Sequence, residues 1–106
     1  MVETLDRLFA TIASRKDGDP GTSYTAKLLA AGVEKCAKKF GEEATEAVIA
    51  AIQKDKTELA RESADVLYHL LVLWAASGIT PHDVYQVLQS REGQSGLEEK
   101  ASREKG

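Results

Sequence analysis

The chain has 106 residues, of which 42% are hydrophobic, and this size predicts a single domain with a modest core. Its 14 basic and 17 acidic residues are mixed along the sequence and give a net charge of -3, which excludes the broad basic surface that polymeric DNA or RNA requires. The N-terminus has no signal-peptide pattern and the strongest apolar run, residues 70–76, is too short to span a bilayer, so we expect a cytoplasmic protein with no membrane partner.

Two short helices and a loop are predicted for the first third of the chain. Apolar residues recur at three- and four-residue spacing over residues 5–12, which predicts an amphipathic helix. The following stretch, RKDGDPGTS at residues 15–23, is typical of a loop, and its cation Arg15 is a candidate substrate contact. Ser23 is then expected to cap a second short helix, which Gly32 ends.

Two long helices are predicted next, over residues 33–54 and residues 57–77, with Gly78 ending the second. Their connection is short, so we expect an antiparallel hairpin. The only cysteine, Cys36, has no partner for a disulfide within the chain and is expected to be a buried thiol. The residues expected to face the core are Val33, Cys36, Ala37, Phe40, Ala44, Ala47, Val48 and Ala51 in the first helix, and Leu59, Val66, Leu70, Leu73 and Trp74 in the second.

A fifth helix is predicted from a cap at Thr80, a proline at its first position, Pro81, and an acidic first turn at Asp83. No segment shows strand-like alternation, so the predicted fold class is all-α, with a domain over residues 1–90 and a frayed or disordered polar tail over residues 91–106. Because so small a helical core gains stability by sharing apolar surface with a second copy, we expect a homodimer.

The two long helices each carry an acidic pair spaced three residues apart, Glu43 with Glu46 and Glu62 with Asp65. Residues at this spacing are neighbours on a helix, and both pairs are expected to face the seam between the helices. Like charges placed so close repel unless a cation neutralises them. Carboxylate oxygens are the ligands that Mg²⁺ prefers, and a partly hydrated Mg²⁺ suits phosphoryl chemistry. The pattern therefore predicts a magnesium site.

The alternative is that these acids form a solvated helix face paired with Lys38, Lys39 and Arg61. Two observations weigh against it. The lysines precede their glutamates by four residues, which is the less favourable order for an ion pair on a helix. In addition, Asp65 interrupts a segment that is otherwise apolar enough to be largely buried.

Basic residues precede the acids on the same helix. Lys35 and Lys39 share a face with Glu42 and Glu46, and either a phosphate clamp or ordinary surface charge explains them. His69 follows Asp65 by four residues, so it is a candidate to contact substrate, to position water or to hydrogen-bond Asp65 within the core. The hydrogen bond to Asp65 is the favoured interpretation.

Three longer segments join these residues into one pattern: SYTAKLL at residues 23–29, EKCAKKFGEEATEAV at residues 34–48 and ELARESADVLYHLLVL at residues 58–73. Together they closely resemble the phosphoribosyl-ATP pyrophosphohydrolase family, within the all-α, MazG-like superfamily of nucleoside triphosphate pyrophosphohydrolases. The resemblance runs from about residue 5 to residue 88. Phe40 departs from it, because a smaller aliphatic residue is expected there, but the acidic pattern is intact.

The resemblance implies hydrolysis of phosphoribosyl-ATP to phosphoribosyl-AMP and pyrophosphate, the second step of histidine biosynthesis, by a magnesium-dependent homodimeric helical bundle. It also implies roles for individual residues. The metal ligands would be Glu43, Glu46, Glu62 and Asp65. Glu42 would be a further acid, for a second ion or for orienting water. Lys35 and Lys39 would hold phosphates, and the nucleotide pocket would be shaped by Ser23, Tyr24 and Thr25.

Two other functions remain open at this point. The first is a pyrophosphohydrolase of the same fold that acts on dUTP or a damaged nucleotide, which a metal-site pattern does not reject. The second is a helical dimerisation module without enzymatic activity, whose acids are only a solvated face. Metal-dependent turnover would rule out the dimerisation module, but it would not distinguish between the two kinds of pyrophosphohydrolase.

Overall fold

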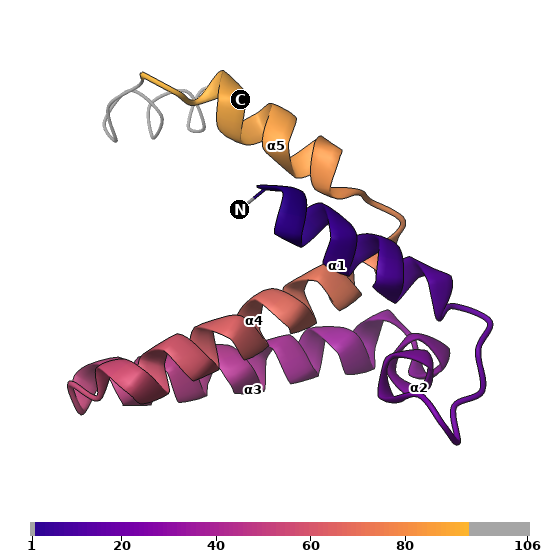
Figure 1. The fold of residues 1–106 in the computed structure, drawn as a ribbon, viewed down its shortest axis with the longest axis horizontal. Coiled ribbons are helices and arrows are strands. Elements are labelled where there is room, and N and C mark those ends of the chain that lie inside the picture. The colour runs from indigo at the N-terminus through magenta and orange to yellow at the C-terminus, as the bar shows by residue number, and fades with distance from the viewer. Residues whose placement is uncertain (1, 94–106) are drawn as a thin grey trace.

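The computed structural model describes residues 2–93, and these form five α-helices, which confirms the predicted all-α class (Figure 1). The helices are α1 (Val2–Ser14), α2 (Tyr24–Ala31), α3 (Val33–Ile52), α4 (Lys56–Ser77) and α5 (Pro81–Ser90). In the part of the chain that the structure describes, α3 and α4 form a long hairpin, while α1 and α5 pack together near the C-terminal end of α4. Residues 94–106, which make up most of the predicted tail, lie outside the described residues.

The hairpin of α3 and α4 is antiparallel, as its short connection predicts. Lys54 turns the chain in the left-handed conformation, with φ 59°. Asp55 caps α4 by accepting a hydrogen bond of 3.0 Å from the backbone N–H of Glu58. Because this cap starts the helix directly after Asp55, Lys56 is the first residue of α4, and not part of the connection as expected from the sequence. At the other end, Gly78 adopts the left-handed conformation that ends α4.

Local capping signals also set the starts of the short helices α2 and α5. Ser23 caps α2 by accepting a hydrogen bond of 3.1 Å from the backbone N–H of Ala26. Thr80 and Asp83 form a reciprocal capping box at the start of α5, with Pro81 at the first helical position. No described helix alone combines the length and hydropathy of a membrane span; α4 and α5 meet those criteria only as a pair, and their axes are bent by 107°.

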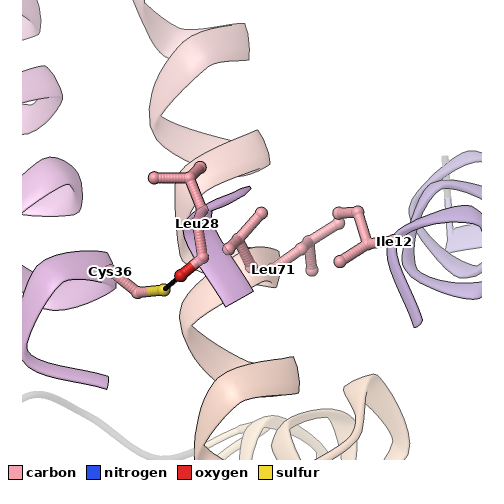
Figure 2. Packing of buried hydrophobic residues seen from close by; sticks show 5 residues of the cluster. Ile12, Leu28, Cys36 and Leu71 are labelled. Atoms are coloured by element: carbon pink, nitrogen blue, oxygen red, sulfur yellow. Dashed lines mark hydrogen bonds between the residues drawn. The ribbon is translucent and has the colours of Figure 1, made fainter. Parts of the chain in front are cut away.

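The core lies where α1, α2, α3 and α4 converge. Its buried members are Ile12, Leu28, Cys36, Leu71 and Val72. Figure 2 shows Leu71 of α4 reaching toward Ile12 on one side and toward Leu28 and Cys36 on the other. The Cys36 thiol donates a hydrogen bond of 3.3 Å to the carbonyl oxygen of Leu28, and burial raises the pKa of this thiol. The prediction of a buried cysteine is therefore confirmed.

The inward-facing residues of the long helices were predicted only in part. On α4, Leu71 and Val72 are the most deeply buried residues, whereas the predicted Leu73 and Trp74 only border the core. On α3, the predicted core residue Val48 is 55% exposed. Other predicted core residues of α3 that are exposed are Val33, Ala37 and Ala51. The physical reason is that α4 covers one side of α3 while α2 reaches only its beginning, so an apolar strip of α3 stays uncovered.

Candidate functional site

Three carboxylates from the two long helices meet in the middle of the hairpin. Glu43 of α3 and both Glu62 and Asp65 of α4 each offer one oxygen atom, and these oxygens lie within 4.8 Å of one another. The antiparallel packing brings one turn of α3 opposite one turn of α4, which is why residues far apart in sequence converge here. Glu43 and Glu62 are half-buried while Asp65 is exposed, so this carboxylate group opens to solvent on the Asp65 side.

The charges of this carboxylate group are poorly neutralised by the protein itself. Burial, together with the adjacent carboxyls of Glu58, Glu46 and Asp65, raises the pKa of Glu62 to about 7. Burial also raises the pKa of Glu43, with repulsion from Glu46 and Asp65 adding to it. The Oε2 atom of Glu62 is buried and has no hydrogen-bond partner among the described residues. Because buried oxygen atoms in proteins normally have a partner, this atom is a candidate to bind an ion or a water molecule.

These features fit a hard divalent cation. All three donors are carboxylate oxygens, the ligand type that Mg²⁺ and Ca²⁺ prefer, and a cation would satisfy Glu62 Oε2 while relieving the repulsion. Glu46, the fourth predicted ligand, lies beside Glu43 and Glu62 and raises the pKa of both, but its carboxylate is outside the three-residue group. The hairpin thus brings together three of the four acids and keeps the fourth adjacent to them.

Glu42 has a different partner from the other acids. Its Oε2 lies 3.2 Å from the ammonium nitrogen of Lys39, three residues before it on α3. This hydrogen-bonded pair lowers the pKa of Glu42 and raises the pKa of Lys39. Glu58 is similarly 3.7 Å from Arg61. The interpretation of the acids as solvated ion pairs therefore describes Glu42 and Glu58, and not the carboxylate group at the seam.

His69 lies behind this carboxylate group and is only 6% exposed. Its Nε2 atom is 4.0 Å from Glu43 Oε1, and its ring meets those of Tyr24 and Tyr68 edge to face, with centroids 6.1 Å and 5.0 Å away. Burial, reinforced by the charge of Lys39, lowers the pKa of His69 and so favours the neutral ring.

The favoured sequence interpretation of His69 was wrong. Within residues 2–93 it makes no hydrogen bond to Asp65, and its Nδ1 atom is buried without a partner. Asp65 and His69 are one turn apart on α4, but the packing of the two helices brings Glu43 of α3 to within 4.0 Å of the His69 ring instead.

A pocket of about 260 Å³ lies between α2 and α3, next to Lys39. Its lining comprises Tyr24, Lys27, Leu28, Ala31, Lys35 and Lys39. Lys35 and Lys39 share one pocket, as their four-residue spacing predicts, while Lys38 is not part of the lining. Lys27 was missed by the sequence analysis; its place three residues after Tyr24 puts both on one face of α2, but its position beside Lys35 depends on the packing of α2 against α3.

The residues of the SYT segment have separate structural roles. Ser23 caps α2, and Thr25 shares a hydrogen bond with the hydroxyl of Tyr68 that ties the start of α2 to α4. Tyr24 is 52% exposed and forms part of the pocket wall. Arg15 is exposed in the loop before α2 and lines neither the carboxylate group nor the pocket.

Comparison with known proteins identifies the family to which this chain belongs. A sequence model of the phosphoribosyl-ATP pyrophosphohydrolase family matches residues 5–92 of this chain. The chain belongs to the phosphoribosyl-ATP pyrophosphohydrolase family. It is 62% identical over 99 residues to the phosphoribosyl-ATP pyrophosphatase of Paracoccus denitrificans, covering 93% of this chain and 92% of that protein. It is 60% identical over 99 residues to that of Cereibacter sphaeroides, covering 93% of this chain and 96% of that protein.

A third relative, the phosphoribosyl-ATP pyrophosphatase of Parvibaculum lavamentivorans, is 63% identical over 99 residues, which cover 93% of this chain and 91% of that protein. The match to the phosphoribosyl-ATP pyrophosphohydrolase family spans the whole candidate site, since the carboxylate group and the lysine-lined pocket both lie within residues 5–92.

Proposed function

We propose that this protein is an enzyme that hydrolyses phosphoribosyl-ATP to phosphoribosyl-AMP and pyrophosphate, the second step of histidine biosynthesis. The observation that carries the proposal is the group formed by Glu43, Glu62 and Asp65 beside a lysine-lined pocket, in a chain of this family. In the reaction, one P–O bond forms from water and the anhydride bond between the α- and β-phosphates breaks. Relatives named for phosphoribosyl-ATP favour this substrate over dUTP or a damaged nucleotide.

We propose Mg²⁺ as the cofactor, held by Glu43, Glu62 and Asp65 with Glu46 as the fourth ligand. Support comes from the all-oxygen donor set and from the unpartnered Oε2 of Glu62. Such an ion, when bound, would neutralise charge on the phosphate chain and on the leaving pyrophosphate. Because the raised pKa of Glu62 leaves this carboxyl partly protonated at neutral pH, it must lose its proton when it becomes a ligand.

Other residues of the chain would bind and orient the substrate. Lys39 and Lys35 face the pocket and are suited to hold phosphate oxygens. Glu42, which holds Lys39 at 3.2 Å, would keep this ammonium directed toward the site and serve as the further acid that orients water. His69, whose neutral form is favoured and which lies 4.0 Å from Glu43, would restrict that carboxylate from behind while supporting the ring of Tyr24.

We further propose that the enzyme is a homodimer. A single chain leaves large apolar side chains uncovered on three helices, and Ile52, at 75% exposed, is the extreme case. Further examples among the described residues are Val33, Val48 and Ile49 on α3, Leu67 on α4, and Val87 and Leu88 on α5. Apolar surface of this extent is unfavourable in water and is expected to be buried between two copies.

A cytoplasmic location is part of the proposal, and the buried free thiol of Cys36 is compatible with a reducing compartment.

The deciding experiment measures pyrophosphate release by the purified protein from phosphoribosyl-ATP, dUTP and ATP, with Mg²⁺ and with a chelator. Magnesium-dependent release from phosphoribosyl-ATP in preference to the other two is the expected result. Preference for dUTP or ATP would refute the proposed substrate but would remain consistent with the proposed metal site. Failure to hydrolyse any of the three would return the protein to the class of dimerisation modules.

A further inference from the structure

The lysine-lined pocket extends away from the carboxylate group along α3. Lys39 precedes Glu43 by four residues, so the two lie only about 6 Å apart along the helix axis. Lys35 precedes Glu43 by eight residues, which corresponds to about 12 Å along the axis. Lys27 joins Lys35 in the same pocket from the neighbouring helix α2. Lys35 therefore starts about two turns of α3 from the carboxylate group, one turn farther than Lys39, and Lys27 shares its pocket.

Lys27 and Lys35 also differ from Lys39 in their partners. Lys39 forms an ion pair with Glu42, whereas within residues 2–93 neither Lys27 nor Lys35 has a carboxylate oxygen within 4.0 Å. Lys35 acts on Glu42 only through its charge, so two cations without an ion-pair contact line one concave pocket, and such a pocket favours a bound anion. A phosphate monoester, with a charge of about -1.5 to -2 at neutral pH, matches this pair.

Tyr24 lines the same pocket as the two lysines and also contacts His69, the neighbour of Glu43. Its ring meets the His69 ring edge to face, and His69 in turn lies 4.0 Å from Glu43; Tyr24 is 52% exposed and forms part of the pocket wall. An exposed aromatic ring offers a face on which a planar base can stack. The structure thus brings three binding elements together: the carboxylate group, an aromatic ring and a pair of lysines.

Phosphoribosyl-ATP carries one chemical group suited to each of these three elements. Its triphosphate is attached to one ribose, its single ribosyl phosphate is attached to another, and the purine lies between the two. Ordinary nucleoside triphosphates have the first phosphate group but lack the second. We propose that Lys27 and Lys35 bind the ribosyl phosphate and thereby select phosphoribosyl nucleotides over ordinary nucleotides, an assignment that rests on the proposed function.

The test compares the binding of phosphoribosyl-AMP and AMP, which differ only by the phosphoribosyl group, to the Mg²⁺-loaded protein by isothermal titration calorimetry. Lys27→Gln and Lys35→Gln each remove one ammonium group at an exposed position. Each is expected to lower the affinity for phosphoribosyl-AMP by about ten- to a hundredfold, which corresponds to the loss of one charged hydrogen bond. The affinity for AMP should be unchanged. The matched control is Lys38→Gln, an equal charge change on α3 outside the pocket, which should affect neither ligand.

Two outcomes would overturn the assignment. Equal weakening of both ligands would mean that the pocket holds the nucleotide's own phosphates, and unchanged affinity for both would mean that the lysines bind neither. Pyrophosphate release by the wild-type protein, measured on the same preparation, separates this inference from the proposed function. A wild-type protein that hydrolyses phosphoribosyl-ATP, with Lys27→Gln and Lys35→Gln behaving like Lys38→Gln, would refute the lysine assignment alone.

Discussion

Magnesium binding should release a proton from Glu62, and the amount should follow the pKa of this carboxyl. With a pKa of about 7 in the metal-free protein, Glu62 is about half protonated at pH 7, about nine-tenths at pH 6 and about one-tenth at pH 8. These fractions are the protons released per ion. Apparent affinity for Mg²⁺ should therefore fall nearly tenfold from pH 6 to pH 5 and change little above pH 8. Glu43, whose pKa is raised by burial, adds to the release at the acidic end.

Calorimetric titration with Mg²⁺ in two buffers of different ionisation enthalpy measures the released protons directly. Glu62→Gln is the matched variant: it keeps the shape of the side chain, should bind Mg²⁺ more weakly, and should release fewer protons between pH 6 and pH 8. The same substitution should abolish turnover while leaving the helical circular dichroism spectrum unchanged. Proton release that is equal at pH 6 and pH 8, or unaltered by Glu62→Gln, would refute the reasoning.

The same pKa makes a prediction about stability. A carboxyl whose pKa is higher in the folded state than in the unfolded state favours folding below its unfolded pKa of about 4.5, and this contribution is lost as pH rises through about 7. The melting temperature of the metal-free protein should therefore carry a contribution that falls between pH 5 and pH 7.5. Saturating Mg²⁺ should restore stability at pH 7.5 more than at pH 5, and equal stabilisation at both values would contradict this linkage.

Substitutions at four further positions test the packing and the site. Leu71→Ala, which truncates a side chain that is 1% exposed, should lower the free energy of unfolding by about 2–5 kcal/mol in urea titrations, and a loss below about 1 kcal/mol would show that Leu71 is not central to the core. Thr80→Ala removes the side-chain acceptor of the α5 capping box and should reduce stability by about 1 kcal/mol, while Thr80→Ser should retain most of it. Tyr68→Phe deletes the hydrogen bond to Thr25 and should raise KM severalfold with little change in kcat; an effect confined to kcat would argue against a role in positioning α2. Ile52→Asp places a charge on the uncovered apolar strip and should shift the protein to monomers in light scattering, whereas dimers of normal affinity would place the interface elsewhere.

The helices and their ends were predictable because the signals are local. Ser23, Asp55 and Thr80 each cap a helix through a hydrogen bond to a backbone N–H three residues ahead, and a glycine ends α2 and α4. Such interactions span one turn, so the residues that make them are adjacent in the sequence. The acidic pairs of the long helices were predictable for the same reason, because residues three apart in the sequence are neighbours on any α-helix.

The composition of the site depended on contacts between helices, which no local pattern specifies. Glu43, Glu62 and Asp65 converge, Glu46 lies beside them, and His69 faces Glu43 across the seam, because α3 and α4 pack in one particular register. Packing between α2 and α3 likewise places Lys27 in the pocket.

The sequence by itself therefore determined the class of fold, the helix boundaries to within a few residues and the chemical types available at the site. Only the tertiary structure decided which carboxylates share one cation-sized space and which apolar residues stay uncovered. The physical reason is that a helix forms from interactions within a few residues, whereas the rotation and register of two packed helices are set by side chains far apart in the chain.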